Sequence, residues 1–211
     1  AKPKFPRALT AAVKAVQERR GSRAMFAKKE ARGGFNIEIT PDLAAFIATI
    51  TTCYLATASA DGQPSIQHRG GPPGFLDVVD PLTIAFADFA GNRQYITTGN
   101  LAENARVCLF LIDYEAQRRV KIWGTARAVE NDPALVAKLF PEGYRARPEQ
   151  AILITVAAWD TNCSQHIPQM FHAGDVAATL ERLQARMREL DADHTALKVR
   201  IAELEAEAAK R

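Results

Sequence analysis

Three short polar segments carry the side chains that are best suited to bind or transform a ligand. The first contains Gln67, His68 and Arg69 and continues into the glycine- and proline-rich stretch 70–74. A guanidinium offers planar donors that suit a phosphate or a polarised carbonyl, and glycines let the backbone approach a ligand closely. A plain turn with a surface arginine would contain the same residues, so this segment alone identifies no site.

The second segment is Asn92, Arg93 and Gln94, which follow an expected strand and open an expected helix. The free amides and the positive partial charge at a helix N-terminus suit a phosphate. Arg93 adds a bidentate cation, whereas Asn92 and Gln94 add neutral donors. The pattern predicts an anion site, although simple capping of the helix by Asn92 would look the same.

The third segment, residues 158–171, contains Trp159, Cys163 and His166. Cys163 and His166 have the spacing of metal ligands, but the sequence offers no second pair at a useful spacing, so we expect no metal site. A nucleophilic Cys–His pair is also disfavoured, because residues three apart on an extended segment usually point to opposite faces. The segment is better interpreted as a polar binding loop topped by an aromatic ring.

The elements that must position these segments are mostly short strands. Runs rich in β-formers, bounded by turn signals such as Asp61-Gly62, predict six strands in a small antiparallel barrel. The expected strands are 52–59, 65–69, 82–88, 106–112, 119–129 and 151–159. Helices are expected at 8–20, at 23–32, after Thr40, at about 92–104 and at about 133–139.

The C-terminal stretch 175–211 has a different period. Its apolar residues recur in alternating steps of three and four, which is typical of a coiled coil. They are Leu180, Leu183, Met187, Leu190, Leu197, Ile201 and Leu204, with His194 as the polar member of the seam. A parallel pair of such helices would bring Arg186 near Asp191, and Arg200 near Glu205, of the partner helix. The stretch just before the repeat contains no Lys or Arg, which argues against a basic-zipper DNA-binding protein.

Composition and charge restrict the class of protein. The 211 residues are 47% hydrophobic and 24% charged, as in a soluble globular chain, and no apolar run is long enough to span a bilayer. Three widely spaced cysteines, and the lack of an apolar N-terminal region, favour the cytoplasm. Residues 1–34 hold ten Lys or Arg and two Glu, a local charge of +8 that leaves −5 of the total +3 for the rest. They lack the stacking aromatics of a nucleic-acid reader, so we interpret them as a solvated helical arm and expect neither a membrane nor a nucleic acid as partner.

The three polar segments, in this order along the chain, resemble the FMN-binding proteins related to pyridoxamine 5′-phosphate oxidase. The motifs that carry the resemblance are QHRGGPPGF, DFAGNRQYITTGNL and AWDTNCSQHIPQ. The resemblance implies a mainly β (α+β) split barrel that forms homodimers, with FMN in clefts between the subunits. It divides the chain into a basic helical extension (1–39), an FMN-binding split-barrel domain (40–172) and a C-terminal coiled-coil helix (173–211).

The resemblance also implies a set of cofactor-binding residues. They are Ile66, Gln67, His68 and Arg69 beside the isoalloxazine and ribityl chain; Ala87 and Asp88 on the neighbouring strand; Asn92, Arg93 and Gln94 at the phosphate; and Trp159, Asn162, Cys163, Gln165 and His166 from the second subunit. Gln94 stands where the family usually has a lysine, so Arg93 and Arg69 would balance the phosphate. The candidates for substrate contact are His68, Arg69 and His166, and no catalytic acid or base is assigned.

The function implied is that of an FMN-dependent oxidoreductase that transfers hydride or electrons through flavin N5 to or from an unidentified small molecule, with NAD(P)H as one donor to test. The basic, tryptophan-containing end that grips vitamin B6 in the true oxidase is missing here, so B6 oxidase activity is not implied. One alternative is a non-enzymatic split barrel that binds flavin or haem for sensing or storage. Another is a scaffold in which the basic arm and the coiled coil recruit a partner.

Overall fold

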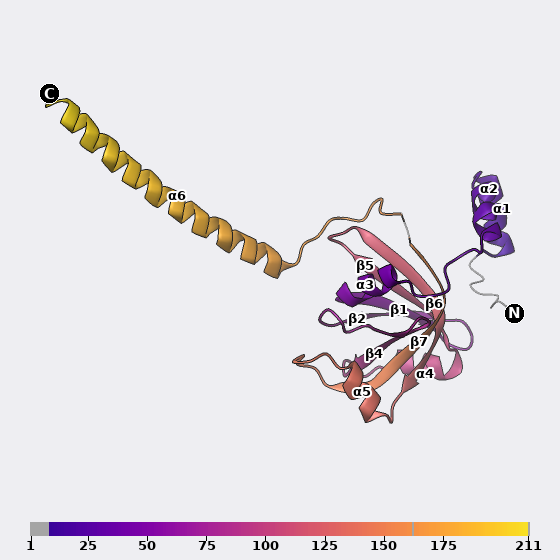
Figure 1. Ribbon diagram of the computed structural model, residues 1–211. Coiled ribbons are helices and arrows are strands. Elements are labelled where there is room, and N and C mark those ends of the chain that lie inside the picture. The colour runs from indigo at the N-terminus through magenta and orange to yellow at the C-terminus, as the bar shows by residue number, and fades with distance from the viewer. Residues whose placement is uncertain (1–8, 162, 211) are drawn as a thin grey trace. The chain divides into compact units, whose positions relative to one another are not determined.

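The computed structural model describes residues 9–161 and 163–210. The chain forms two compact units, which divide between Ile167 and Pro168. Within the described residues there are six helices and seven strands (Figure 1). All seven strands belong to one antiparallel sheet, so the predicted fold class, mainly β with flanking helices, is confirmed.

The strands form a sheet that curls on itself. They are β1 (Thr52–Ala58), β2 (Pro64–Gly70), β3 (Asp77–Asp80), β4 (Thr83–Phe89), β5 (Arg106–Asp113), β6 (Arg118–Val129) and β7 (Pro148–Thr161). Their order in the sheet is β2-β1-β5-β6-β7-β4-β3. Four strands separate β2 from β4 in this order, yet Arg69 Nη1 on β2 lies 3.3 Å from Asp88 Oδ1 on β4. The sheet is therefore an open barrel in which the edge strand β2 approaches β4, the neighbour of the other edge strand.

A bulge between the two longest strands helps the sheet to curl. The register of β6 against β7 shifts between Trp123 and Gly124. A bulge bends its strand and increases the local twist. At this position the strands approach so closely that a Cβ atom on Gly124 would lie 2.2 Å from the carbonyl oxygen of Thr155. Only glycine fits this backbone contact.

The helix α3 (Pro41–Thr49) covers part of the core. It begins at Thr40, whose Oγ1 accepts a hydrogen bond from Leu43 N at 3.2 Å, and a proline occupies its first position. Leu43, Phe46 and Ile47 lie on one face and are buried. The predicted start of this helix after Thr40 is confirmed.

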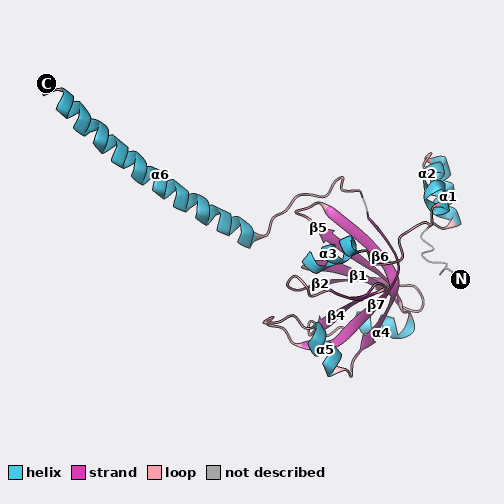
Figure 2. Cartoon of the chain, viewed as in Figure 1, coloured by secondary structure: helices cyan, strands magenta, loops and turns pink. Residues whose placement is uncertain are grey.

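Two further helices pack on the sheet. The helix α4 (Ile96–Glu103) contacts β1 and β6, and α5 (Pro133–Leu139) contacts β4 and β7 (Figure 2). Leu139 of α5 packs with Ala85, Ala87 and Ala151 in a small second core. These alanines leave room for the helix against the strands.

Two helices precede the sheet, α1 (Ala11–Arg19) and α2 (Arg23–Ala31). They are joined through Glu30, which accepts hydrogen bonds from Lys14 Nζ at 2.9 Å and from Arg23 Nη2 at 2.5 Å. These two cations hold the pKa of Glu30 below its ordinary value. The two predicted N-terminal helices are confirmed, and the structure joins them as a small hairpin.

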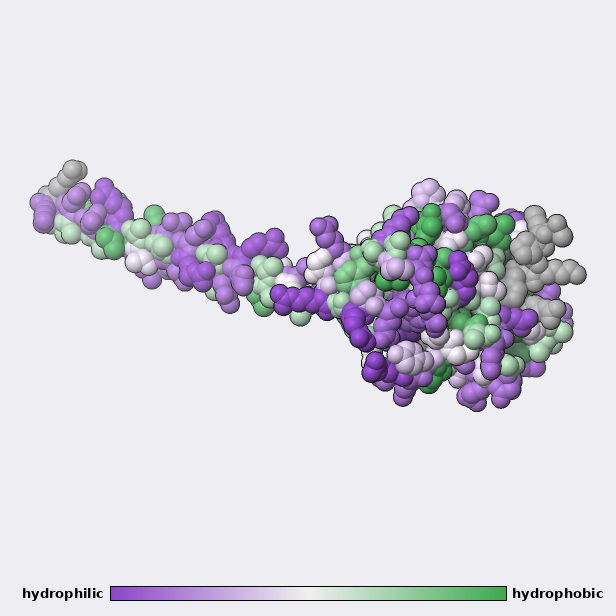
Figure 3. Space-filling model, turned by 90° about the horizontal axis from the view of Figure 1, so that it is seen from below, coloured by the Kyte–Doolittle hydropathy of each residue, from purple (hydrophilic) through white to green (hydrophobic). Residues whose placement is uncertain are grey.

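The C-terminal helix α6 (Ala173–Ala208) contains 36 residues, and none of them is buried. Hydrophobic residues recur along it among hydrophilic ones (Figure 3). The prediction that this stretch is helical is confirmed, whereas its pairing with a second helix stays a prediction.

The structure departs from the predicted elements at β3. Only six strands were expected. The strand β3 was missed because it is short and has just two apolar residues, Val78 and Val79, between aspartates. Four residues are too few to show a period of two.

In the described ranges 9–161 and 163–210, no helix is both long and apolar enough to cross a membrane.

Candidate functional site

A cavity of about 280 Å³ opens between the ends of β2 and β4, the loop after β4, the first turn of α4 and the start of β7. Its apolar wall includes Phe75, Phe86 and Phe89. The remaining wall is polar and charged. The volume lies just below the ~300–1,000 Å³ that is typical of small-molecule sites, so one chain offers room for part of a cofactor-sized ligand.

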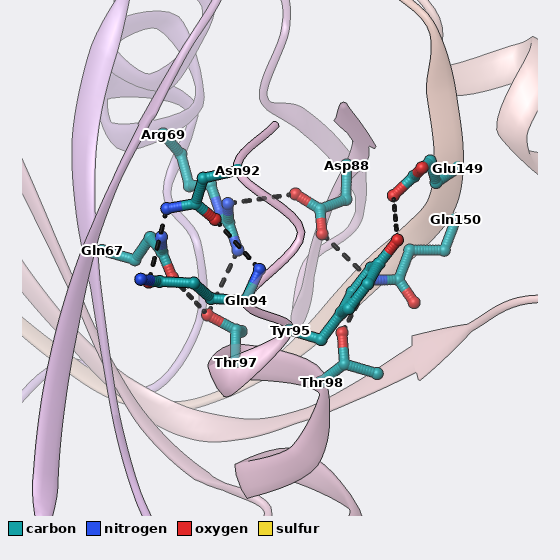
Figure 4. A network of polar contacts seen from close by, with 10 residues as sticks. All are labelled: Gln67, Arg69, Asp88, Asn92, Gln94, Tyr95, Thr97, Thr98, Glu149 and Gln150. Carbon is teal, nitrogen blue, oxygen red and sulfur yellow. Dashed lines mark hydrogen bonds and ion pairs between the residues drawn. The ribbon is translucent and has the colours of Figure 1, made fainter. Parts of the chain in front are cut away.

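Arg69 and Asp88 form the centre of the polar wall. The Nη1 atom of Arg69 lies 3.3 Å from Asp88 Oδ1, and Nη2 donates to Thr97 Oγ1 at 3.2 Å (Figure 4). The hydroxyl of Thr97 in turn donates to Gln67 Oε1 at 3.3 Å. One chain of polar contacts therefore links β2, β4 and α4.

Asp88 is also tied to the start of β7. The Nε2 atom of Gln150 donates to Asp88 Oδ2 at 3.0 Å and to Thr98 Oγ1 at 2.9 Å. Asp88 is 8% exposed and Gln150 is 5% exposed. Because breaking a buried ion pair from one side costs about 3–5 kcal/mol, the Asp88 carboxylate depends on Arg69 and Gln150 together.

Two atoms of this pair have unused hydrogen-bonding capacity. Arg69 Nε and Asp88 Oδ1 are buried and have no hydrogen-bond partner within the described residues. Buried polar atoms in proteins are almost always hydrogen-bonded. A ligand in the cavity that offers one acceptor and one donor would satisfy both.

The loop between β4 and α4 does not have the predicted conformation. The helix begins only at Ile96, because Arg93 (φ 59°) and Tyr95 (φ 53°) have left-handed backbone that a right-handed helix excludes. Asn92 Oδ1 accepts from Gln94 N at 3.1 Å and closes a local turn, which competes with helix formation. The prediction that these residues open a helix is therefore wrong. Arg93 instead lies on an exposed loop, where it lines the cavity.

His68 also lines the cavity, but its ring is held by the neighbouring strand. Its Nε2 lies 2.6 Å from Thr52 Oγ1, and the ring packs edge-on against Tyr54 with centroids 5.7 Å apart. These contacts fix the imidazole as part of the wall and engage one of its two nitrogens.

The sequence profile described as pyridoxamine 5′-phosphate oxidase matches residues 39–163, more than half of the chain. The chain belongs to the pyridoxamine 5′-phosphate oxidase family. The match spans every strand of the sheet and all the residues that line the cavity. The resemblance inferred from the three motifs is confirmed at the level of the family.

Solved structures with a similar arrangement have low sequence identity. HupZ of Group A Streptococcus is 19% identical with a TM-score of 0.49, and the match covers 63% of this chain and 99% of HupZ. An FMN-binding protein from Syntrophomonas wolfei is 11% identical with a TM-score of 0.44 (72% and 95% covered). A general stress protein 26 relative of the pyridoxinephosphate oxidase family from Clostridium acetobutylicum is 14% identical with a TM-score of 0.40 (60% and 88% covered). No curated protein sequence matches the chain significantly.

The cavity is lined by seven of the predicted cofactor-binding residues. They are Gln67, His68, Arg69, Ala87, Asp88, Asn92 and Arg93. Two others from the same segments lie outside the lining: Ile66, which is 68% exposed, and Gln94, which bonds to Asn92. The cavity therefore unites the first two sequence segments, although their specific roles toward FMN stay predictions.

The third segment lies outside the cavity of its own chain. Trp159 is 6% exposed in the barrel core, and its Nε1 donates to the carbonyl oxygen of Glu38 at 2.8 Å. This burial leaves little of the indole for a ligand. Cys163, Gln165 and His166 follow the far end of β7 and do not line the cavity either, and Asn162 lies outside the described residues. Their role toward a second subunit stays a prediction.

Sequence reasoning missed part of the site. Tyr95, Thr97 and Thr98 lie within a quoted motif of the family but were assigned no role, and Glu149 was not considered. The polar pair at positions 149–150, directly before the apolar residues of the expected strand, could have indicated that Glu149 and Gln150 belong to the site.

Across the described residues, no group of three or more His, Cys, Asp or Glu side chains is placed to hold a metal ion.

The three thiols should differ sharply in reactivity, because only the thiolate is an efficient nucleophile. Burial raises the pKa of Cys53 to about 12 and also raises the pKa of the half-buried Cys108, whereas Cys163 is exposed. We expect a thiol reagent at neutral pH to label Cys163 rapidly and the other two only after denaturation. Mass spectrometry of the labelled peptides measures this, and a Cys163→Ser variant should lose the fast phase. Rapid labelling of Cys53 in the folded protein would contradict the structure.

Proposed function

We propose that the chain is a homodimeric FMN-dependent oxidoreductase. The observation that carries this proposal is the meeting of Arg69, Asp88 and Arg93, from two separate segments, in a single cavity whose lining lies within the residues that the family model matches. The flavin domain would be residues 40–172, with residues 1–39 and 173–211 as extensions of it.

The buried pair in the wall fits the edge of a flavin ring. The pyrimidine edge of isoalloxazine has an N–H donor between two carbonyl acceptors. Arg69 Nε is an unused donor and Asp88 Oδ1 an unused acceptor in the cavity wall. The donor set is therefore complementary to such an edge, and the half-buried Phe89 offers apolar surface beside it.

The phosphate of FMN would bind at Arg93. The charge of Arg69 is already balanced by Asp88, whereas Arg93 has no ion pair within the described residues. The turn at Asn92 already engages the backbone N–H of Gln94, and the Gln94 side chain adds no charge. A phosphate dianion would thus rely mainly on one guanidinium, which binds it with two parallel hydrogen bonds.

The protein's part would be to bind and orient the cofactor and to exclude water from it. FMN, when bound, would supply hydride or electron transfer. Arg69 and Asp88 would hold the ring edge, Gln150 and Thr97 keep that pair in place, and Phe89 would shield the ring from water. A cavity of about 280 Å³ in one chain is consistent with a second subunit closing it through Gln165 and His166.

A second candidate is a flavin-binding module without turnover. The polar groups near the cavity are already engaged, because His68 Nε2 faces Thr52, and Asp88 is bonded to Gln150 and paired with Arg69. Among the described residues, His68 and Asp88 are thus held by protein partners and not by a substrate, which is what a binding module needs. Reduction of bound FMN by NADH or NADPH, followed by reoxidation with an added acceptor, would support the enzyme. Failure of both steps, with FMN still bound, would favour the module.

The proposal is tested by titrating the cofactor-free protein with FMN and, as a matched probe, with riboflavin, which lacks the phosphate. We expect saturable quenching of flavin fluorescence with one FMN per chain, and weaker binding of riboflavin. Equal affinity for FMN and riboflavin would contradict the proposed phosphate site at Arg93. No saturable binding of either flavin would overturn the assignment.

A further inference from the structure

The helix α6 presents an apolar stripe that the single chain leaves open. The stripe consists of Val176, Leu180, Leu183, Met187, Leu190, Leu197, Ile201 and Leu204, whose exposed fractions lie between 43% and 64%. Together with His194, these residues recur in steps of three and four, so they share one face of the helix. Most of the stability of a protein helix comes from packing its apolar face against another element. In the single chain, no residue of this 36-residue helix is buried.

We propose that this stripe pairs with the same stripe of a second copy of the chain, in a parallel and in-register coiled coil. The seam alternates between two sets of positions. Leu183, Leu190, Leu197 and Leu204 form one set, and leucine in that set favours two-stranded coils. The occupant is therefore a second copy of α6, and the orientation follows from the charges beside the seam.

Every charged pair that flanks the seam is favourable in the parallel arrangement. Such a coil places the residue directly before Met187, His194 or Ile201 next to the residue five places further along the partner helix. Arg186 then meets Asp191 of the partner subunit, Asp193 meets the partner's Lys198, and Arg200 meets the partner's Glu205. Each of the three contacts joins opposite charges.

The charges of the single helix are consistent with this pairing. Arg186 and Arg200 are engaged only by Glu189 and Glu203, three residues further along the same helix, at 2.8 and 2.9 Å. Asp191, Asp193, Lys198 and Glu205 have no ion pair within the described residues. These exposed side chains are free to bond across the seam.

The antiparallel alternative fits less well. With full overlap, it would set Asp191 against its own copy, Asp193 against its own copy, and Arg186 against Arg200. Like charges at such positions repel. A shift by one heptad would restore opposite charges but would leave Val176 and Leu180 uncovered.

His194 defines the register. It occupies the central seam position between Met187 and Ile201, so in the in-register pair it faces the same residue of the other chain, where two imidazoles can share a hydrogen bond. A slip by one heptad would put the imidazole against an apolar side chain and leave it unpaired. A single polar seam residue fixes register in this way at a cost in stability.

The orientation is tested with cysteines in the full chain that carries Cys163→Ser. Since a disulfide needs Cβ atoms about 4 Å apart, Leu197→Cys should give a covalent dimer under mild oxidation, because residue 197 faces itself in the parallel pair. The matched control is Val199→Cys, on the opposite face of the helix, which should give several-fold less dimer. A mixture of Met187→Cys and Leu197→Cys chains of different mass should give little mixed dimer, since those positions meet only when the helices are antiparallel.

Two outcomes would overturn the proposal. Predominance of the mixed 187–197 dimer would establish the antiparallel pair, and equal cross-linking at 197 and 199 would show mere proximity without a seam. As a second measurement, Leu190→Glu combined with Leu197→Glu should lower the helical circular dichroism, with Ala192→Glu as control. Unchanged helicity in the double variant would also contradict pairing, and FMN titration of each variant separates this result from the cofactor assignment.

Discussion

Replacing Arg93 with asparagine should weaken FMN binding by roughly 10- to 100-fold, because a hydrogen bond to a charged group contributes about 1.5–3 kcal/mol. Asparagine removes the cation but tolerates left-handed backbone, so the loop at φ 59° should keep its shape. Riboflavin has no phosphate and should bind the variant as it binds the parent. Fluorescence titration with both flavins measures the loss and attributes it to the phosphate.

The matched control is Arg106→Asn, which removes an exposed arginine of β5 that does not line the cavity. This variant should bind FMN with the affinity of the parent. Arg93→Lys should fall between, since an ammonium keeps the charge but loses the planar pair of donors. If Arg93→Asn and Arg106→Asn bind FMN equally well, the phosphate is held elsewhere.

Replacing Gly124 with alanine should destabilise the barrel by about 3 kcal/mol, the upper part of the usual range for overpacking. The added Cβ would lie 2.2 Å from the carbonyl oxygen of Thr155 and 3.1 Å from its carbon. Both are backbone atoms of the adjacent strand, so β6 and β7 would have to separate at the bulge. For a chain of this length the melting temperature should fall by about 6–12 °C.

Gly99→Ala is the control for this substitution. Gly99 lies within α4, and a Cβ there meets no atom within 4 Å. Alanine in a helix interior is favoured over glycine by up to about 1 kcal/mol, so this variant should melt at or above the temperature of the parent. Equal melting temperatures for Gly124→Ala and the parent would contradict the close approach of the strands.

Local patterns in the sequence predicted most of the fold. The cap at Thr40 and the apolar face of α3 specify a helix within a few residues, and six strands have enough β-formers to be recognised. The strand β3 was missed because Asp77–Asp80 is too short to show a period. Strand order could not be derived at all, since it depends on pairs distant in sequence, such as β4 with β7.

The candidate site was likewise predicted only in part. Gln67 and Arg69 were predicted because their strand end and glycine loop lie in one short segment. The contact of Gln150 with Asp88 joins residues 62 apart, and only the sheet register brings them together. Trp159 was expected at a ligand, but the segment that follows α2 covers it, so its aromatic character serves the core of its own chain.

In the loop before α4, two residues that line the cavity have a backbone conformation that lowers the stability of the fold. Arg93 and Tyr95 each adopt left-handed backbone, which costs a residue with a side chain about 1 kcal/mol relative to glycine. Glycine at either position would relax the loop, but it would bring neither a guanidinium nor a phenol to the cavity. Selection for heat resistance alone would therefore drive both positions toward glycine, and a thermostable descendant obtained in that way would lack the guanidinium that we propose for the phosphate.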